Sequence, residues 1–273
     1  MDRSHSSPFG SDPHDPKDAN GRETANWEAA GYRIPILYED NHVLVVVKPP
    51  GLLSQGDDTG RPNLLDILKE RRKVRERKPG RAYLALLHRL DRQVGGVLAF
   101  AKTSKAAARL FAAIRQRRWE KGYLAVVVGL PQPEKGTLRH ALRKIPGKPR
   151  VRLVDPEDPA GKEAVLTYET LKYADGLSLL RVRLVTGRPH QIRVQLATLG
   201  TPIWGDHVYG RRTDRKREKA PDEIPIGLWA AYLSFAHPTT GEPLEFVALP
   251  PREAPWTHFP RLRDVVESFV RHP

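Results

Sequence analysis

Hydrophobic residues along this chain come mostly in short runs bounded by Gly, Pro, Asn and Asp, a pattern typical of β-strands joined by turns. The first two runs, residues 34–38 and 42–47, are rich in β-branched residues and are separated by the turn residues 39–41. Two prolines end the second run, because proline cannot donate a hydrogen bond to a neighbouring strand. The same reasoning predicts strands over residues 34–38, 42–47, 83–87, 97–101, 123–128, 164–171, 178–184, 229–237 and 244–248.

Two other segments repeat apolar residues every three or four positions, which predicts helices. The first follows Asn63, whose side chain is suited to cap a helix N-terminus. The second follows Thr103 or Ser104, either of which can cap it, and runs to about Arg118. A third helix is predicted in HQIRVQLATLG, where Gly200 stops it.

The order of these elements indicates one folded unit. Residues 34–250 contain no internal repeat and no linker, so we expect an α+β fold whose mainly antiparallel mixed sheet is flanked by helices and loops. Residues 1–30 are rich in Ser, Pro, Asp and Gly and lack hydrophobic periodicity, which predicts a disordered acidic tail. We therefore divide the chain into this tail and a catalytic or binding domain over residues 31–273.

The charge of the chain indicates what kind of partner the protein binds. The 273 residues contain 46 Lys and Arg against 32 Asp and Glu, a formal net charge of +14. Residues 1–30 hold three basic and six acidic residues, so the other 243 carry +17. Such a surplus favours a polyanionic partner, most simply nucleic acid. The most basic run, residues 69–81, is either a solvated helix face or a phosphate-binding surface.

Composition also excludes several classes of chemistry. Without cysteine the chain has no disulfide, thiolate metal site, iron–sulfur cluster or cysteine nucleophile. The ten histidines lack metal-ligand spacing, and no phosphate-loop, serine-elbow or dinucleotide motif is present. No apolar run approaches the roughly 18 residues that span a bilayer. We therefore expect neither metal nor membrane, and, since no signal-peptide pattern is present, a cytoplasmic protein.

Two loops concentrate polar groups beside apolar strands. In residues 88–96, Asp91 lies between two arginines and precedes a pair of glycines, so it is either an ordinary turn residue or a carboxylate at a ligand site. Residues 186–193 crowd basic and amide side chains at the entry to the third helix. They are either helix caps and surface charge or a site that pairs an arginine with a carboxylate.

Four stretches, in the same order along the chain, resemble motifs of one known enzyme family. HRLDRQVGGVLAFAKTSKAAARL resembles the catalytic motif of RluA-type pseudouridine synthases. GRPHQIRVQLATLGTPIWGDHVYG, YEDNHVLVVVKPPGLL and LSFAHPTTGEPLEF are similar to further stretches of that family, in the same order. The resemblance covers roughly residues 34–250 and implies the catalytic fold of these enzymes.

The resemblance implies an activity and a partner. Such an enzyme isomerises specific uridines of RNA, in rRNA or tRNA, to pseudouridine, and it uses no cofactor and no metal. The target base has to leave its stack to enter the active site, at a cost of a few kcal/mol. We expect a monomer whose RNA affinity comes from the basic residues 69–81, 139–152 and 211–219, because residues 1–30 are too short and too acidic for the S4 RNA-binding domain that is frequent in this family.

The resemblance also assigns residues. Asp91 matches the essential carboxylate, which either attacks the nucleoside covalently or removes the 2′ proton of its sugar. Arg193 matches the arginine that forms an ion pair with this aspartate, and Tyr123 matches the tyrosine that packs on the uracil. Substrate-binding roles, in holding the flipped nucleotide or in shaping the arginine loop, fall to His88, Arg89, Arg188, His190 and Gln191.

Several positions depart from the family pattern. Val94-Gly95-Gly96 replaces the common Thr-Ser-Gly, and Trp229 replaces a histidine that is common in the late strand. Pro189 stands where threonine is usual, and Gln195 where histidine is usual. These changes put substrate preference in doubt more than catalysis. The alternatives are an inactive RNA-binding paralogue and a basic DNA-binding or ribosome-associated structural protein, although the former is expected to lose Asp91 or Arg193.

Overall fold

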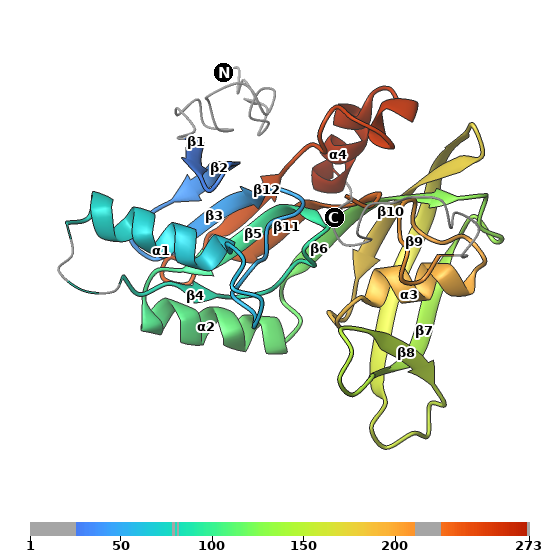
Figure 1. The fold of residues 1–273 in the computed structure, drawn as a ribbon, viewed down its shortest axis with the longest axis horizontal. Helices are drawn as coiled ribbons and strands as arrows, with labels where there is room; N and C mark the ends of the chain where they lie inside the picture. Colours follow the sequence, from blue (N-terminus) through green and yellow to red (C-terminus); the bar gives the residue numbers. More distant parts are fainter. Residues whose placement is uncertain (1–25, 78–79, 81, 211–224, 272–273) are drawn as a thin grey trace, which may run out of the picture.

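The computed structural model describes residues 26–77, 80, 82–210 and 225–271, which form a large mixed sheet with helices on both of its faces (Figure 1). The strands are β1 (Asn26–Ala29), β2 (Tyr32–Glu39), β3 (Val43–Lys48), β4 (Ala85–Leu86), β5 (Gly95–Ala101), β6 (Glu120–Val128), β7 (Lys135–Lys144), β8 (Val151–Val154), β9 (Lys162–Ala174), β10 (Leu177–Leu184), β11 (Leu228–Ala236) and β12 (Pro243–Val247). The helices are α1 (Leu64–Arg75), α2 (Ser104–Arg115), α3 (Gln191–Thr198), the 3₁₀ turn η2 (Trp256–His258) and α4 (Leu262–Arg271).

The strand order confirms the predicted α+β class with a mainly antiparallel sheet. The path through the sheet is β1-β2-β3-β5-β11-β6-β10-β9-β7-β8, with β12 beside β11 and β4 beside β5. Among the described strands, β5 and β11 pair in parallel and every other pairing is antiparallel. The centre of the sheet therefore joins segments that lie more than a hundred residues apart in sequence.

Alternating side chains of the central strands reach two separate hydrophobic cores, because successive residues of a strand point to opposite faces. On β5, Leu98 and Phe100 belong to one core, whereas Val97 and Ala99 belong to the other. Helices α1 and α3 contribute to the first core, and α2 and α4 to the second. Covering both faces keeps the apolar run of β5 buried along its whole length.

The predicted helix ends are largely confirmed. The Asn63 side chain accepts a hydrogen bond from the N–H of Asp66 at 3.0 Å, as an N-cap does. Thr103 caps α2 in the same way, and this helix ends at Arg115, three residues before the predicted end. Gly200, with φ of +74°, follows α3 in the left-handed conformation that stops a helix.

Some predictions were wrong in extent. The predicted tail over residues 1–30 includes β1, which pairs with β2, while residues 1–25 lie outside the described part of the chain. The strand predicted over residues 83–87 is reduced to β4. In the basic run 69–81, Arg71 and Arg72 are buried and ion-paired, so neither a solvated face nor phosphate contact applies to them. The predicted basic segment 211–219 lies outside the described residues.

Candidate active site

Asp91 lies in the loop between β4 and β5, at the entry to the central strand of the sheet. The N–H of Val94 donates to the Asp91 carbonyl at 3.0 Å and closes a tight turn around the side chain. The Ser54 hydroxyl donates to the Leu90 carbonyl at 2.7 Å and accepts the Leu90 N–H at 3.1 Å. These bonds fix the backbone on both sides of Asp91, so its carboxylate has a defined direction.

Lys48, at the end of β3, fastens the same loop from behind. Its side chain is fully buried, and its ammonium donates to the carbonyls of Pro49, Leu52 and Arg92 at 3.0, 2.7 and 3.1 Å. The N–H of Gly51 reaches the same Arg92 carbonyl at 2.8 Å. Burial lowers the pKa of Lys48 to about 7. The Lys-Pro-Pro-Gly segment thus positions the Asp91 loop rather than only ending a strand.

Arg193, on α3, holds the Asp91 carboxylate with one end of its guanidinium and a second carboxylate with the other. Its Nη1 donates to Asp91 Oδ2 at 2.9 Å, while Nε and Nη2 donate to the two oxygens of Asp206 at 2.7 and 2.9 Å. The side chains of Arg193 and Asp206 are 3% and 0% exposed, against 26% for Asp91. Of the two carboxylates, only that of Asp91 is open to a ligand.

Arg193 and Asp206 stabilise each other's charges. Burial by itself would lower the pKa of Arg193, but hydrogen bonds and charge from Asp206 and Asp91 raise it above its ordinary value. Burial would raise the pKa of Asp206, but Arg193 and the N–H groups of Val208 and Tyr209 hold it below its usual range. One cation between two carboxylates leaves the site with a net negative charge.

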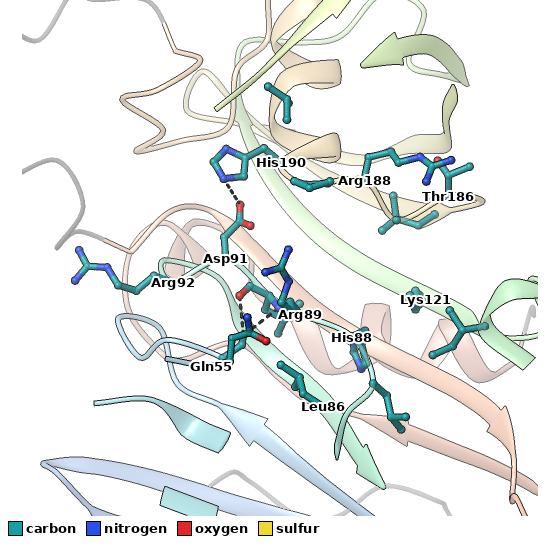
Figure 2. Close-up of a pocket in the computed structure, with 18 of the residues that line it drawn as sticks. Gln55, Leu86, His88, Arg89, Asp91, Arg92, Lys121, Thr186, Arg188 and His190 are labelled. Atoms are coloured by element: carbon teal, nitrogen blue, oxygen red, sulfur yellow. Dashed lines mark hydrogen bonds and ion pairs between the residues drawn. The ribbon is translucent and has the colours of Figure 1, made fainter. Parts of the chain in front are cut away.

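The loop before α3 is built to present Arg193 and His190. Gln191 is 2% exposed, and its amide accepts from the Thr186 hydroxyl at 2.8 Å and the Arg188 N–H at 3.0 Å. His190 has the left-handed φ of +50°, and its Nε2 lies 3.8 Å from Asp91 Oδ2. Figure 2 shows these two side chains pointing toward one another from opposite walls of a cleft.

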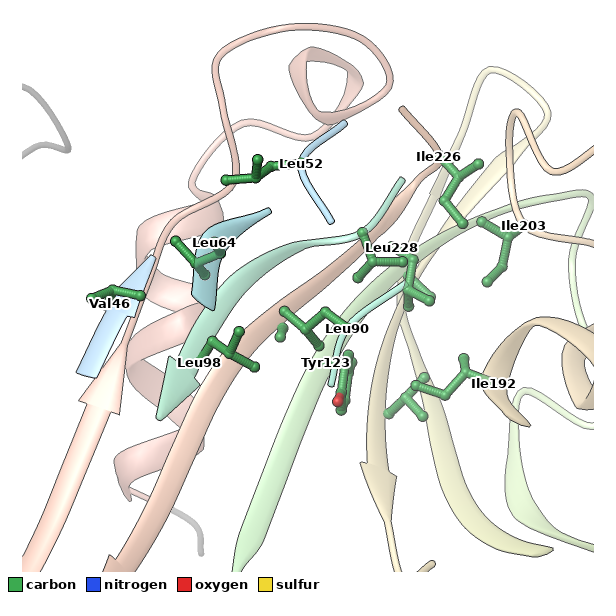
Figure 3. Packing of buried hydrophobic residues seen from close by; sticks show 14 of the residues in the cluster. Val46, Leu52, Leu64, Leu90, Leu98, Tyr123, Ile192, Ile203, Ile226 and Leu228 are labelled. Carbon is green, nitrogen blue, oxygen red and sulfur yellow. The ribbon is translucent and has the colours of Figure 1, made fainter. Parts of the chain in front are cut away.

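Asp91 and His190 line a cleft of about 1020 Å³ that also contains Tyr123 of β6. Tyr123 is 7% exposed and belongs to the same buried cluster as Leu90 and Ile192 (Figure 3). Burial and the charge of Asp91 raise the pKa of Tyr123, so it meets a ligand as a neutral phenol. An aromatic ring beside a partly exposed carboxylate suits a flat ligand that has to be attacked or deprotonated.

The cleft is strongly basic apart from the carboxylate. Its acidic lining residues are Asp57 and Asp91. Its Lys and Arg lining residues are Arg89, Arg92, Arg115, Arg117, Lys121, Lys144, Arg150 and Arg188. These basic side chains attract the phosphate backbone of a nucleic acid. The Asp91 carboxylate then faces the sugars and bases that are attached to this backbone. Within the described ranges, no group of three or more His, Asp or Glu side chains could hold a metal ion.

Comparisons with known proteins agree with this geometry. The family model described as RNA pseudouridylate synthase matches residues 42–198. The chain is 34% identical over 239 residues to Ribosomal large subunit pseudouridine synthase D of Vibrio cholerae, covering 81% of this chain and 69% of that protein. It is 36% identical over 220 residues to Ribosomal large subunit pseudouridine synthase C of Salmonella typhimurium, covering 78% and 65%.

The chain belongs to the RNA pseudouridine synthase family. Solved structures bear this out at the level of the fold. Human RNA Pseudouridylate Synthase Domain Containing 4 superimposes with a TM-score of 0.65 at 26% identity, covering 80% of this chain and 88% of that chain. Human RNA Pseudouridylate Synthase Domain Containing 1 gives 0.63 at 25% identity, covering 87% and 95%. The protein is therefore an isomerase that converts uridine of RNA to pseudouridine.

The pseudouridine synthase structure brings together most residues that the sequence singled out. Asp91, Tyr123, His88, Arg89, Arg188 and His190 all line one cleft, and Arg193 contacts Asp91 from beneath it. Gln191 is the exception. It does not line the cleft: its amide oxygen and nitrogen are used inside the loop, the latter on the Val165 carbonyl at 3.0 Å, which fits the expected role in shaping the arginine loop, while contact with substrate stays a prediction.

His88 reaches the cleft in a neutral form. Its Nε2 accepts the N–H of Ala99 at 3.2 Å, and its ring meets Trp119 edge-on with centroids 5.6 Å apart. Burial, together with the charge of Lys121, lowers the pKa of His88 well below its ordinary value. Of the two ring nitrogens, Nδ1 then carries the proton. His88 can donate one hydrogen bond to a ligand but offers no positive charge to a phosphate.

Two departures from the family pattern form one packing unit. Trp229 of β11 lies directly opposite Gly95 of β5. A Cβ on Gly95 would come within 2.2 Å of the Trp229 ring, so the tryptophan occupies the space that a side chain there would need. The indole N–H donates to the Ala248 carbonyl at 2.9 Å, which fixes the ring. The small residue at position 95 and the large one at 229 therefore compensate each other.

The other two departures do not touch the carboxylate. Gln195 is fully buried, and its amide nitrogen donates to the carbonyls of Leu138 and Ala164 at 3.2 and 3.1 Å. It therefore ties α3 to β7 and β9. Pro189 is exposed at the rim of the cleft, next to His190. Asp91, Tyr123 and Arg193 keep their arrangement in spite of all four changes.

Sequence reasoning missed the roles of Asp206, Lys48 and Lys121. Asp206 stands in GDHVYG, a stretch that already resembled the family, but nothing in its spacing reveals that it clamps Arg193. Lys48 follows a buried strand and precedes two prolines, which was a usable signal that its ammonium faces inward.

No helix in the described ranges is long and apolar enough to cross a membrane.

Proposed function

We propose that Asp91 is the essential carboxylate of pseudouridine formation in this protein. The observation that carries this proposal is the asymmetry of its two oxygens. Oδ2 is held by Arg193, whereas Oδ1 has no hydrogen-bond partner among the described residues, in a carboxylate that lines the cleft. A fixed oxygen and a free one let the same group be aimed by the protein and still react with a ligand.

The reaction moves one glycosidic bond. The N1–C1′ bond of uridine breaks, the uracil turns, and C5 bonds to C1′ while C5 loses a proton and N1 gains one. Asp91 Oδ1 either attacks C1′ or removes the 2′ proton of the sugar, and both routes need a carboxylate at this place. Tyr123 supplies a neutral aromatic wall for the turning base.

We propose that the target nucleotide leaves its stack to enter the cleft. Flipping costs a few kcal/mol. Contacts of the phosphates with the basic lining residues, and of the base with Tyr123, offset this cost. Arg89 and Arg188 lie on opposite walls, one beside Asp91 and the other before α3, so both sides of the cleft can bind backbone (Figure 2).

We further propose large-subunit rRNA as the substrate. The relatives from Vibrio cholerae and Salmonella typhimurium are ribosomal large subunit pseudouridine synthases. The chain spans about two thirds of the length of each. The basic lining of the cleft suits the phosphate backbone of a folded RNA.

The test is incubation of the full chain with deproteinised large-subunit rRNA and, separately, with a tRNA pool. Pseudouridine is then mapped by carbodiimide-induced stops of reverse transcription. New stops in large-subunit rRNA that disappear with Asp91→Asn support the proposal. Stops in tRNA alone overturn the proposed substrate, and stops that persist with Asp91→Asn overturn the role of Asp91.

A matched control is available at the end of β10 opposite to its cleft-lining residue Leu184. Asp175 lies in the turn between β9 and β10, is 73% exposed and has the left-handed φ of +52° that asparagine also accepts. Asp175→Asn removes the same charge without touching the cleft. We expect this variant to give the same stops, at the same rate, as the unaltered chain.

A further inference from the structure

Lys121 is one of the basic lining residues of the cleft, but neither the motifs nor the proposed reaction assigns it a contact of its own. It lies on β6 two residues before Tyr123, so both side chains point to the same face of the sheet. Both also line the cleft, and Figure 2 places Lys121 beside His88 on the wall away from His190. Two residues along a strand correspond to about 6.6 Å. A group bound at Lys121 therefore lies beyond the base that contacts Tyr123.

Lys121 has no counter-ion in the part of the chain that the structure describes. The contact that the protein gives its ammonium is the Trp119 ring, at 5.7 Å from the centroid. Burial lowers the pKa of Lys121 to about 8, which leaves it mostly charged at pH 7. Holding a partly buried charge without a carboxylate is unfavourable, and a bound anion would remove this cost.

Two side chains near Lys121 have hydrogen-bond donors, those of His88 and Trp119. His88 Nε2 already accepts the Ala99 N–H, so the neutral ring presents its Nδ1 proton. Trp119 is 7% exposed and stacks on Phe235, with 4.4 Å between the ring centroids. Its buried indole Nε1 has no acceptor among the described residues. The Lys121 ammonium and the His88 N–H thus lie in the same part of the cleft, and both can donate to an oxyanion.

Two arginines that line the cleft come shortly before Trp119 in the sequence. Arg115 ends α2, and Arg117, two residues later, has a left-handed φ of +57°. Arg117 is exposed and contacts Glu163 at 3.7 Å, so it is partly balanced, whereas no carboxylate of the described residues pairs with Lys121. A ligand that follows this wall meets the exposed arginines first and the half-buried ammonium last.

We propose that Lys121 binds a backbone phosphate of the RNA next to the uridine that enters the cleft. A lysine ammonium is a compact point charge that suits phosphate oxygens, and His88 Nδ1–H can share them. The inference rests on the proposed function, because it assigns the phosphate to the RNA that the cleft isomerises. It makes Lys121 a substrate-binding residue that fixes how far the RNA strand enters.

The first experiment uses an RNA fragment that carries the uridine mapped by reverse transcription. Binding is measured on the Asp91→Asn background, so that no product forms. With Lys121→Met we expect roughly tenfold weaker binding and a salt slope, log Kd against log salt, reduced by about 0.7 to 0.9. Lys121→Arg keeps the charge and should keep the slope. Lys172→Met, on an exposed lysine of β9 distant from the cleft, is the matched control.

The second experiment changes the RNA and not the protein, so it does not depend on how the variant folds. Neutral methylphosphonate is placed at one backbone position at a time around the target uridine. At one position it should weaken binding to the Lys121-containing protein by about the same factor as Lys121→Met. At that position the Lys121→Met protein should show no further loss, while other positions weaken both proteins alike.

Steady-state kinetics in the Asp91-containing protein separate binding from chemistry. We expect Lys121→Met to raise KM and leave kcat unchanged. An unchanged salt slope, the absence of a shared methylphosphonate position, or a fall in kcat at unchanged KM would overturn the proposal while the fragment is still isomerised. Failure of the proposed function is distinct, because the unaltered chain would then produce no pseudouridine in any RNA.

Discussion

Two buried ion networks in this protein contain the same kinds of side chain but differ in which charge is in excess. In the cleft, Arg193 lies between two carboxylates, Asp91 and Asp206. At the other end of the sheet, Glu39 of β2 lies among cations: it pairs with Arg71 at 3.0 Å, with Lys102 at 2.9 Å and with Arg75. One network has a carboxylate in excess and the other has cations in excess.

The difference lies in what is left unsatisfied. Both oxygens of Glu39 are used by cations, and its side chain is 11% exposed. These contacts fasten α1 to β2 and to the residue after β5, and they leave nothing for a ligand. Asp91 is 26% exposed and keeps Oδ1 free. A closed network stabilises the fold, whereas a network with one open oxygen can do chemistry.

The largest expected effect is that of Asp91→Asn on turnover. We expect kcat to fall by at least about 10³-fold, because among the described residues no other carboxylate reaches the cleft beside Arg193. The free energy of unfolding should change by no more than about 1 kcal/mol, because Arg193 keeps Asp206 as its partner. Single-turnover assays and urea denaturation measure the two quantities. A large loss of stability would show that the open network is structural as well.

Glu39→Gln should give the reverse result. It removes the Glu39 carboxylate from Arg71 and Lys102, which are 7% and 6% exposed, and Lys102 keeps a longer contact with Glu76 at 3.8 Å. We expect this to lower the free energy of unfolding by about 3 to 5 kcal/mol. Turnover per folded molecule should not change. The control is Glu70→Gln, an exposed glutamate on α1 for which we expect less than about 0.5 kcal/mol. Loss of turnover at full occupancy of the folded state would contradict the division between the networks.

Asp206→Asn should affect both properties, since Asp206 belongs to the open network but is itself fully buried. Arg193 loses one carboxylate, and Asp91 then draws the guanidinium out of position. We expect kcat to fall by about 10²-fold, as misplacement of a catalytic group does, and stability to fall by about 2 to 3 kcal/mol. Activity equal to that of the unaltered chain would show that Asp91 alone positions Arg193.

The smallest effect is a dependence on pH. Burial would raise the pKa of Glu39, but hydrogen bonds and charge from Arg75, Lys102 and Arg71 lower it from 4.5 to about 2. The folded protein then binds fewer protons than the unfolded chain between these values. The stabilisation is therefore complete above about pH 4.5 and is lost as the pH falls toward 2. The stability gap between the unaltered chain and Glu39→Gln should close over this range, as urea midpoints will measure, and a constant gap would contradict the assignment.

The sequence predicted most of the fold because its signals are local. Turn residues between apolar runs located nine of the twelve described strands, all but β1, β7 and β8. Asn63 and Thr103 located two helix starts through bonds that span three residues. The errors fall where the signal is not local. Four residues of the expected tail became β1 because β2 offered an edge to pair with, and the strand predicted over residues 83–87 kept two residues that pair with β5.

The site was predicted less completely, for the same physical reason. The motifs named Asp91, Tyr123 and Arg193, and the side chains lie together as expected. They did not reveal that Gln191 turns inward, since that depends on which acceptors β9 presents. The family pattern also gave no reason why Gly95 and Trp229 change together, because they meet only across the parallel pair of β5 and β11.

By itself, the sequence determined the α+β class, the ends of most elements and the loop that carries the carboxylate, because these follow from periodicity, turns and caps. Only the tertiary structure decided which charged side chains are paired inside the protein and which can meet a ligand. It buried Arg71 and Arg72 inside the protein and left Lys121 in the cleft without a counter-ion from the described part of the chain. Net charge cannot separate these cases, because the energy of a charge depends on its solvent and its partners, and chain folding fixes both.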